Sequence, residues 1–389
     1  STYRSVQRWD DNVINVCQES TYRFLERVVD DLIAMHAEAG TPLDVIHVGG
    51  DEVPAGVWRH SPACEALIAA SPDINAPPQL FDHFLERMAD ILDQRDIRLA
   101  GWEEIALTER FYGEGEKEPN PVHVERRFLP FAWRAIWGRG AEDLGYRLAN
   151  TGYEIVMSNA SSLYFDLAYD KDPEEPGFYW AGLISTRTAW EFVPFDLFRT
   201  ARLDIMGNPI DETAYTDAVR LTGEGRRNIL GIQGQLWGET LVEPSRMEYM
   251  AFPRLLALAE RAWSPEPAWA LIDDRPQREE ALLAAWNEFA NRLGQRELPR
   301  LDYLHDGIGY RIPVAGGVID GGVLHANVSY PGMAIHYTTN GRTPTLHSPR
   351  YEGPVEVDGP VALRVFDTRG RGGRTVTLPE THATKATAR

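Results

Sequence analysis

The chain has 389 residues, which is enough for one large α/β domain and a small additional module. Its formal net charge of −19 argues against nucleic acid and anionic membranes as partners, and it holds no apolar run long enough to span a bilayer. Its only two cysteines, Cys17 and Cys64, exclude a disulfide framework. Their spacing leaves one bridge and two free thiols equally open.

Helical and strand patterns alternate along most of the chain. An amphipathic helix is predicted over 20–39, with Ser20 as its cap and Gly40 at its end. Short apolar runs predict strands, of which the first, rich in β-branched residues, indicates a buried parallel strand. The predicted strands are 43–48, 97–102, 130–136, 153–157 and 229–236, and further helices are expected near 79–95, 140–150 and 245–262.

Strands that alternate with helices indicate a parallel sheet, here most of a (β/α)8 barrel. A closed barrel has eight strands, so about three N-terminal strands are expected to be missing before the first predicted helix. The first residue is Ser1 and not Met, which fits a truncated start and says nothing about export. An open α/β sheet is the alternative. In a barrel the carboxyl ends of the strands build the active site.

The pattern changes after about residue 300, where short alternating runs are separated by turns such as Asn340-Gly341. These runs predict a small antiparallel β-sandwich. We therefore expect a barrel over 1–305, an immunoglobulin-like sandwich over 306–380 and a tail over 381–389.

Asp51 and Glu52 follow the first predicted strand and two glycines, in the segment 47–52 (HVGGDE). Two adjacent acids do not fit an opposed catalytic pair, whose carboxyls come from separate positions about 5 Å or about 6.5–9.5 Å apart. Neighbouring strand residues also face opposite ways, so both acids reach one pocket only where the strand breaks into a loop. The pair indicates one proton-transfer carboxyl beside one supporting carboxylate, with the nucleophile found elsewhere, and a substrate with a 2-acetamido group can supply it. A helix cap with a first-turn acid is the alternative.

Short motifs at the predicted strand ends resemble family 20 glycoside hydrolases, especially bacterial chitobiase-type β-N-acetylhexosaminidases. In chain order they are 11–24, 47–52, 101–104 (GWEE), 158–166 (SNASSLYFD), 231–239 (GIQGQLWGE) and 259–264 (AERAWS). Segment 337–345 is similar to the small C-terminal sandwich of the same enzymes. The family's sugar-binding Arg lies near the first barrel strand, a region that is expected to be missing here.

The resemblance implies a role for each matching polar residue. Glu52 would be the general acid and then the general base, which requires a raised pKa. Asp51 would hold the N–H of a 2-acetamido group, and Tyr164 would donate a hydrogen bond to its oxygen. That oxygen would attack the anomeric carbon, giving an oxazolinium intermediate and retention of configuration. Asp166 and Glu239 would bind sugar hydroxyls.

The aromatic residues of these motifs resemble the walls of the sugar pocket. Trp102, Trp190 and Trp237 would enclose the acetamido methyl and the sugar face, and Trp137 would line the same cleft or the neighbouring subsite. Each of them is also a candidate core residue. His47 either touches the edge of the pocket or is a structural histidine that supports the first carboxylate.

Glu103 and Glu104 could face the cleft or bulk water, and neither is predicted to be catalytic. No cluster of His, Cys, Asp or Glu has metal-ligand spacing, and no phosphate loop or nucleophile elbow occurs, so neither metal nor cofactor is expected. The small sandwich is expected to have a structural role. The sequence does not indicate an oligomeric state.

The resemblance predicts exo-hydrolysis of terminal β-linked N-acetylglucosamine, or of N-acetylgalactosamine, from chitobiose, chitooligosaccharides or glycans. A non-catalytic carbohydrate-binding remnant would use the same tryptophans but would not need both Asp51 and Glu52. An open α/β enzyme of another class is the third alternative. Chitobiase-type enzymes work outside the cytoplasm, which implies a periplasmic or extracellular protein. A bridge between Cys17 and Cys64 would support that location.

Overall fold

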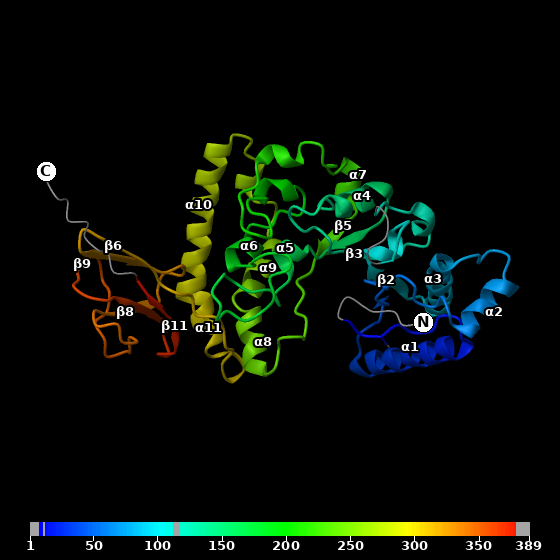
Figure 1. The fold of residues 1–389 in the computed structure, drawn as a ribbon, viewed down its shortest axis with the longest axis horizontal. Helices are drawn as coiled ribbons and strands as arrows, with labels where there is room; N and C mark the ends of the chain where they lie inside the picture. The colour runs from blue at the N-terminus through cyan, green and yellow to red at the C-terminus, as the bar shows by residue number, and fades with distance from the viewer. Residues whose placement is uncertain (1–7, 11, 112–116, 379–389) are drawn as a thin grey trace. The chain divides into compact units, whose positions relative to one another are not determined.

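The computed structural model describes residues 8–10, 12–111 and 117–378. The chain forms two compact units that interleave in sequence (Figure 1). The sheet unit comprises 1–167, 179–184 and 192–235, and the helix-sandwich unit comprises 168–178, 185–191 and 236–389. The predicted tail at 381–389 lies outside the described residues, and the predicted limits at 305 and 380 stay predictions.

The sheet unit is built on a parallel sheet of five strands, which follow one another across the sheet in chain order. All five predicted strands are confirmed, and with them the α/β class. The strands are β1 (Val45–His47), β2 (Arg98–Trp102), β3 (Leu129–Ala132), β4 (Ile155–Met157) and β5 (Ile229–Ile232). Because they are parallel, their carboxyl ends share one edge of the sheet.

The first strand differs from the prediction that it is buried, and the strand at the opposite edge of the sheet is exposed in the same way. Val45 in β1 is 39% exposed and Leu230 in β5 is 51% exposed, whereas β2 is almost wholly buried. Among the described residues, β1 and β5 each pair with only one neighbouring strand. An apolar, β-branched run therefore identified the strand correctly but not its burial, which depends on the neighbours that a sequence pattern does not reveal.

Helices flank this sheet, and the longest are α1 (Glu19–Ala39) and α3 (Pro77–Asp93). They contact each other, and α3 packs its apolar face on β2. The cap predicted at Ser20 is wrong, because α1 begins one residue earlier and its N-cap is Gln18. Gly40 ends α1 in the left-handed region, as predicted. The remaining helices of this unit are α2 (Pro62–Ala70), α4 (Leu144–Thr151), α5 (Ala160–Leu163) and α7 (Gly223–Arg227).

A disulfide bond joins Cys17, just before α1, to Cys64 in α2, with a sequence separation of 47 residues. Closing a loop of this length restricts the unfolded chain and contributes about 4 kcal/mol in the chain-entropy model. We therefore expect the double variant Cys17→Ser/Cys64→Ser to lose about 2–4 kcal/mol of unfolding free energy, measured by urea denaturation. Reductant should destabilise the unchanged protein and leave the double variant unaffected. Equal sensitivity of both proteins to reductant would contradict this prediction.

The helix-sandwich unit contains α6 (Thr186–Trp190), α8 (Pro244–Ala251), α9 (Arg254–Trp263), α10 (Arg275–Arg292) and α11 (Leu298–Leu301). The single helix predicted over 245–262 is in fact the pair α8 and α9. Pro253 stands at the N-cap of α9 and has no N–H to donate, so the helical hydrogen bonds of α8 cannot continue through it.

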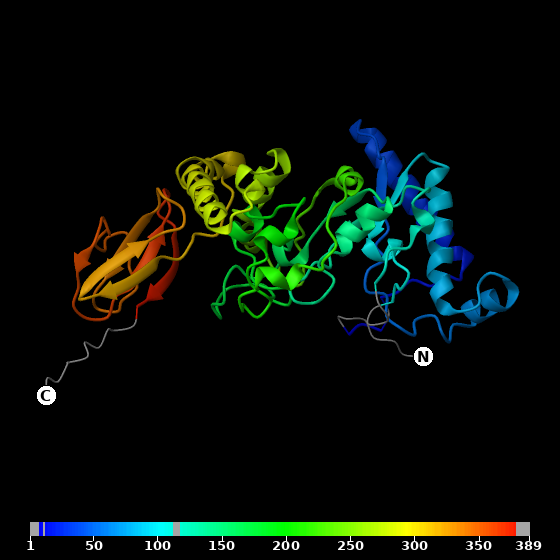
Figure 2. The same ribbon diagram turned by 90° about the horizontal axis from the view of Figure 1, so that it is seen from above.

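Two three-stranded antiparallel sheets follow in the same unit, as Figure 2 shows in orange and red. The first sheet has the order β6-β7-β9 and the second the order β11-β10-β8. β7 pairs with β6 across the Gly321-Gly322 turn. The strands are β6 (Gly316–Asp320), β7 (Val323–Asn327), β8 (Ala334–Thr338), β9 (Val355–Glu356), β10 (Ala362–Phe366) and β11 (Gly372–Thr377).

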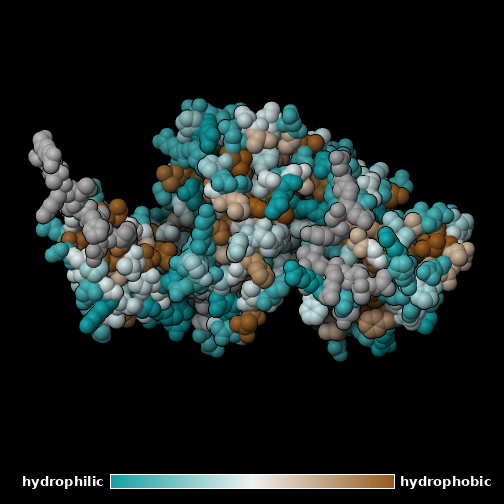
Figure 3. Space-filling view, in the orientation of Figure 1, coloured by the Kyte–Doolittle hydropathy of each residue, from teal (hydrophilic) through white to brown (hydrophobic). Residues whose placement is uncertain are grey.

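The surface is predominantly hydrophilic on the face drawn in Figure 3, where hydrophobic residues lie in small groups among polar ones. This mixture agrees with a chain in which charged residues make up 25% of the sequence. Among the helices that the structure describes, none is both long enough and apolar enough to cross a membrane.

Candidate active site

The carboxylate pair lies where β1 breaks into a loop. The strand ends at His47, and Gly49 and Gly50 follow with φ angles of 78° and 105°. Glu52 itself has φ 49°, in the left-handed region that non-glycine residues seldom adopt. The predicted break in the strand is therefore confirmed. Left-handed backbone at Glu52 is a local strain of the kind that concentrates at functional sites.

The ends of β1 and β2 are pressed against each other beside this loop. The backbone N–H of Trp102 donates to the carbonyl oxygen of Gly49 at 3.0 Å. A Cβ atom at Gly101 would stand 2.8 Å from the same oxygen and 2.6 Å from Ile105. Only glycine fits at position 101 without a shift of the backbone. Trp102 is thereby fixed at the end of β2, where it is 8% exposed.

His47 contacts aromatic rings on the same edge of the sheet. Its ring meets those of Trp102 and Phe131 edge to face, with centroid separations of 4.9 Å and 5.0 Å. Its Nδ1 accepts a hydrogen bond from the backbone N–H of Gly49 at 3.2 Å. Although solvent reaches part of the ring, burial by the surrounding protein lowers its pKa to about 4. A neutral His47 therefore braces the glycine turn, and its role at the edge of the pocket or in support of Asp51 stays a prediction.

Asp51 and Tyr164 lie within electrostatic reach of each other. Solvent reaches part of Asp51, but the protein atoms around its carboxyl raise its pKa. Tyr164 follows α5 and is buried, and its pKa is raised well above the ordinary value by burial and by four carboxylates: Glu103, Asp166, Asp51 and Glu104. Tyr164 consequently keeps its proton at neutral pH, so its hydroxyl is a donor and not a phenolate acceptor.

Glu103 and Glu104 are both fully buried, so the alternative in which they face bulk water is wrong. Glu103 accepts hydrogen bonds from the backbone N–H groups of Trp133 and Arg134, at 2.9 and 3.3 Å. Glu104 accepts one from the indole Nε1 of Trp133 at 3.3 Å and pairs with the Arg134 guanidinium at 2.5 Å. The two carboxyls thus orient the segment that follows β3.

Burial and the neighbouring charge of Glu103 raise the pKa of Glu104 to about 8, despite the opposing effect of Arg134. Glutamate in an unfolded chain titrates near pH 4.3, so between these values the folded state binds the extra proton. Folding stability should therefore fall as pH rises from about 4.5 to 8, by at most about 1.4 kcal/mol per pH unit. We expect Glu104→Gln to weaken this dependence, measured by urea denaturation at pH 5 and pH 8.

A matched control is Glu118→Gln, since Glu118 is 56% exposed and pairs with Arg147 at the surface. This control should keep the pH dependence of the unchanged protein. Equal pH dependence in the Glu104→Gln and unchanged proteins would contradict the assignment of the proton to Glu104.

Trp133 is a candidate pocket residue that the sequence reasoning missed. It directly follows β3 and contacts Trp180 edge to face at 6.2 Å, and Trp180 contacts Tyr164 in the same way at 5.7 Å. These three rings therefore join the ends of β3 and β4. The available signal was position, since an aromatic residue directly after a barrel strand stands where active-site residues stand.

Trp137 lies further along the same loop and packs against Phe198 and Tyr215, with ring separations of 6.3 Å and 5.7 Å. Tyr215 also lines a cavity of about 510 Å³ with Glu142 and Asp204. These contacts give Trp137 a packing role, and its assignment to the sugar cleft stays a prediction. Among the residues that the structure describes, no cluster of His, Cys, Asp or Glu is arranged to hold a metal ion.

Three predicted site residues belong to the helix-sandwich unit. Trp190 is 2% exposed and packs against the rings of Trp269, Trp286 and Phe289. In that unit Trp237 is half-buried and Glu239 is exposed. These ring contacts give Trp190 a packing role. The placement of all three against a sugar stays a prediction.

Comparison with known proteins shows the family to which the chain belongs. The model of the glycosyl hydrolase family 20 catalytic domain matches residues 1–266. The chain belongs to glycosyl hydrolase family 20. The chitobiase/β-hexosaminidase C-terminal domain matches residues 297–375, which include the two antiparallel sheets except for the last two residues of β11. Family 20 membership confirms the predicted fold class, a barrel-type α/β domain with a small C-terminal domain, and decides against an unrelated open α/β enzyme.

Two curated family 20 relatives and one solved structure illustrate the likeness. The β-hexosaminidase of Vibrio vulnificus is 33% identical over 402 residues, covering 96% of this chain and 44% of the relative. The N,N'-diacetylchitobiase of Vibrio harveyi is 31% identical, covering 84% of this chain and 39% of the relative. An exo β-N-acetylglucosaminidase of Vibrio harveyi, solved with N-acetylglucosamine, gives a TM-score of 0.55 at 29% identity, covering 80% of this chain and 38% of that one. The chain thus spans less than half the length of these relatives.

Proposed function

We propose that the protein is an exo-acting β-N-acetylhexosaminidase. It releases a terminal, non-reducing β-linked N-acetylglucosamine, or N-acetylgalactosamine, from chitobiose, chitooligosaccharides or glycans. The observation that carries this proposal is the strained glycine turn after β1, which places Asp51 and Glu52 together at the carboxyl edge of the sheet, with Tyr164 in electrostatic reach of Asp51. Family membership and the names of the relatives support the same activity.

Adjacent carboxyls suit a reaction in which the substrate brings its own nucleophile. Glu52 protonates the glycosidic oxygen as it leaves and then activates the incoming water. Asp51 accepts the N–H of the 2-acetamido group and so raises the electron density on its carbonyl oxygen. That oxygen attacks the anomeric carbon from the face opposite the leaving group, and water later opens the oxazolinium ring by attack from the face that the leaving group occupied. The two displacements together retain the anomeric configuration.

The surrounding groups hold the acetamido group and the sugar ring in place for this attack. Tyr164 is a buried donor that stays protonated, so it can donate to the acetamido oxygen in a site of low polarity. Asp166 is buried two residues further on, where it can accept from a sugar hydroxyl. Trp102 and Trp133 offer the apolar faces that a sugar ring or an acetamido methyl requires, and Trp237 and Glu239 keep their proposed roles as sugar-binding residues.

We also propose that the protein works outside the cytoplasm, in the periplasm or beyond the cell. The disulfide bond between Cys17 and Cys64 supports this location, because such bonds form and persist in oxidising compartments. The small C-terminal domain is proposed to be structural, and neither metal nor cofactor takes part in the proposed mechanism.

The proposal is tested by comparing two aryl β-glycosides on the full-length protein, one of N-acetylglucosamine and one of glucose. The acetamido substrate should be hydrolysed with retention, and the glucoside should react at least about 1,000-fold more slowly, since it lacks the intramolecular nucleophile. Proton NMR of the first-formed product reports the configuration. Comparable hydrolysis of both glycosides, or inversion, would refute the proposal.

A further inference from the structure

A loop of the helix-sandwich unit, Ala168–Phe178, lies in the chain between residues of the proposed site. Tyr164 and Asp166 precede it and Trp180 follows it, and all three belong to the sheet unit. The backbone N–H of Ala168 donates to the carbonyl oxygen of Phe178 at 2.7 Å, so the two ends of the loop are held together. A shift of the loop is therefore transmitted through the backbone to both flanking segments at once.

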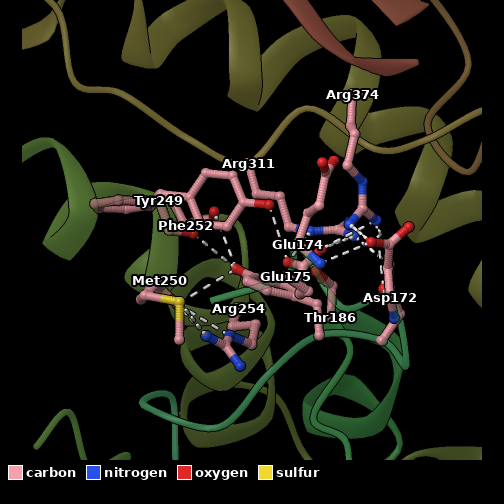
Figure 4. Close-up of polar contacts among 12 residues, drawn as sticks. Asp172, Glu174, Glu175, Thr186, Tyr249, Met250, Phe252, Arg254, Arg311 and Arg374 are labelled. Atoms are coloured by element: carbon pink, nitrogen blue, oxygen red, sulfur yellow. Dashed lines mark hydrogen bonds and ion pairs between the residues drawn. The ribbon is translucent and has the colours of Figure 1, made fainter. Parts of the chain in front are cut away.

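Two arginines hold this loop by its acidic side chains (Figure 4). Arg311 binds Glu175 through two hydrogen bonds, of 2.7 and 3.0 Å, and Asp170 through a third, of 2.6 Å. Arg374, from β11, pairs with Asp172 at 2.8 Å and with Glu175 at 3.2 Å. The Glu175 side chain is 1% exposed, so its charge is paired in the absence of water. Two hydrogen bonds from one guanidinium to one carboxylate fix the orientation of the carboxylate as well as its distance.

Tyr169 fastens the beginning of the same loop. Its ring lies between the guanidinium groups of Arg254 and Arg311, at 3.7 and 4.6 Å from the ring centroid. Its hydroxyl lies 3.1 Å from the carbonyl oxygen of Phe252, at the junction of α8 and α9. Tyr249 adds a hydrogen bond of 2.9 Å to Glu175. Arg311 therefore contacts both the first part of the loop and its most buried acid.

We propose that Arg311 and Arg374 are positioning residues for the active site, which act through the loop Ala168–Phe178 on its two flanks. This inference rests on the proposed function, because it assigns the flanking Tyr164 and Trp180 to the acetamido pocket. Arg374 belongs to the second antiparallel sheet, so the small C-terminal domain takes part in shaping the pocket. Its role thus goes beyond that of a spacer.

Positioning, as distinct from general stabilisation, predicts a specific kinetic pattern. Tyr164 is proposed to hold the acetamido oxygen in line with the anomeric carbon, so a displaced Tyr164 misplaces the nucleophile and lowers kcat more than it raises KM. Misplacement of a reacting group by about 1 Å costs on the order of 100-fold in rate. We expect Arg311→Met to reduce kcat on an aryl β-N-acetylglucosaminide by about 10- to 100-fold at a temperature well below its unfolding midpoint.

Arg371→Met is the matched control. Arg371 makes a comparable pair of bonds in the same unit, to Asp302 and Asp367, and none is recorded to the loop among the described residues. It should lower stability while kcat stays within about twofold. Arg374→Met provides a second test at a less buried position, where the substitution is less damaging to folding. Its loss of kcat should be smaller than that of Arg311→Met. Arg311→Lys keeps the charge without the fork, and should recover part of the loss.

Hydrogen exchange followed by mass spectrometry supplies a readout that does not depend on turnover. Peptides spanning 164–180 should exchange faster in Arg311→Met than in the unchanged protein, and at the unchanged rate in Arg371→Met. Unchanged kcat and unchanged exchange in Arg311→Met would overturn the proposal, as would an equal loss of kcat in Arg371→Met. If the unchanged protein fails to hydrolyse the substrate, the proposed function fails, while the exchange rates still decide whether the arginines hold the flanks.

Discussion

Replacing Glu52 by Gln should reduce kcat on chitobiose by about 100- to 10,000-fold, the range that a single general acid–base group contributes. Glutamine preserves the size of the side chain and its left-handed backbone, but it can neither give a proton to the leaving oxygen nor take one from water. The loss corresponds to about 3–5 kcal/mol of transition-state stabilisation. Steady-state kinetics with chitobiose measure it directly.

The leaving group provides an internal check on the role of Glu52. The dinitrophenolate of a dinitrophenyl glycoside leaves as a stable anion and needs little protonation. Cleavage of its glycosidic bond should therefore be far less impaired by Glu52→Gln than cleavage of chitobiose. Binding of N-acetylglucosamine should persist in this variant. Glu65→Gln, at an exposed position in α2, is the matched control and should behave as the unchanged protein. Normal turnover of chitobiose by Glu52→Gln would favour a carbohydrate-binding protein with another catalytic group, or none.

Replacing Asp51 by Asn should have the second largest effect, a loss in kcat of about 100-fold or more on acetamido substrates. Asparagine is nearly isosteric, but its neutral amide is a much weaker acceptor for the acetamido N–H and cannot stabilise the positive charge of the oxazolinium ring. The loss should appear mainly in kcat, because the charge is absent from the bound substrate. An unchanged kcat with only a raised KM would show that Asp51 merely binds the sugar.

On the acid side of the pH–rate profile, activity should depend on the protonation of Asp51. The reaction requires its carboxylate form, and burial raises its pKa above that of an ordinary aspartate. Activity should therefore decline as pH falls through this raised pKa, at a higher pH than an exposed aspartate would produce. The decline should disappear from the residual activity of Asp51→Asn, which has no carboxyl to protonate at that position.

The parts of the fold that follow from local patterns could be predicted from the sequence. The strands β2 and β4 were recognised because short apolar runs end in glycine, tryptophan or asparagine at the start of a loop. The break at Gly49-Gly50 followed from the freedom of glycine and the need for two adjacent acids to share a pocket. Pro253 could have predicted the division between α8 and α9. The helical spacing of apolar residues over 245–262 nevertheless led to the prediction of a single helix.

Features that depend on distant neighbours could not be predicted. The sequence places Glu103 and Glu104 after a strand. It does not show that Arg134, which follows the end of the next strand, pairs with both of these buried carboxyls. Trp190 has the same local pattern as a pocket aromatic, and the sequence does not reveal that three other rings pack around it. The interleaving of the two units is likewise invisible, since Ala168–Phe178 carries no compositional boundary.

The ring contacts from Trp133 through Trp180 to Tyr164 offer a built-in optical probe. Trp180 is 42% exposed, and its indole should therefore emit at a wavelength that depends on the local water. A sugar bound beside Tyr164 would displace that water and shift the emission, without any label. Comparing the shift in the unchanged protein with that in Trp180→Phe would turn a structural contact into a binding assay for substrates that are never cleaved.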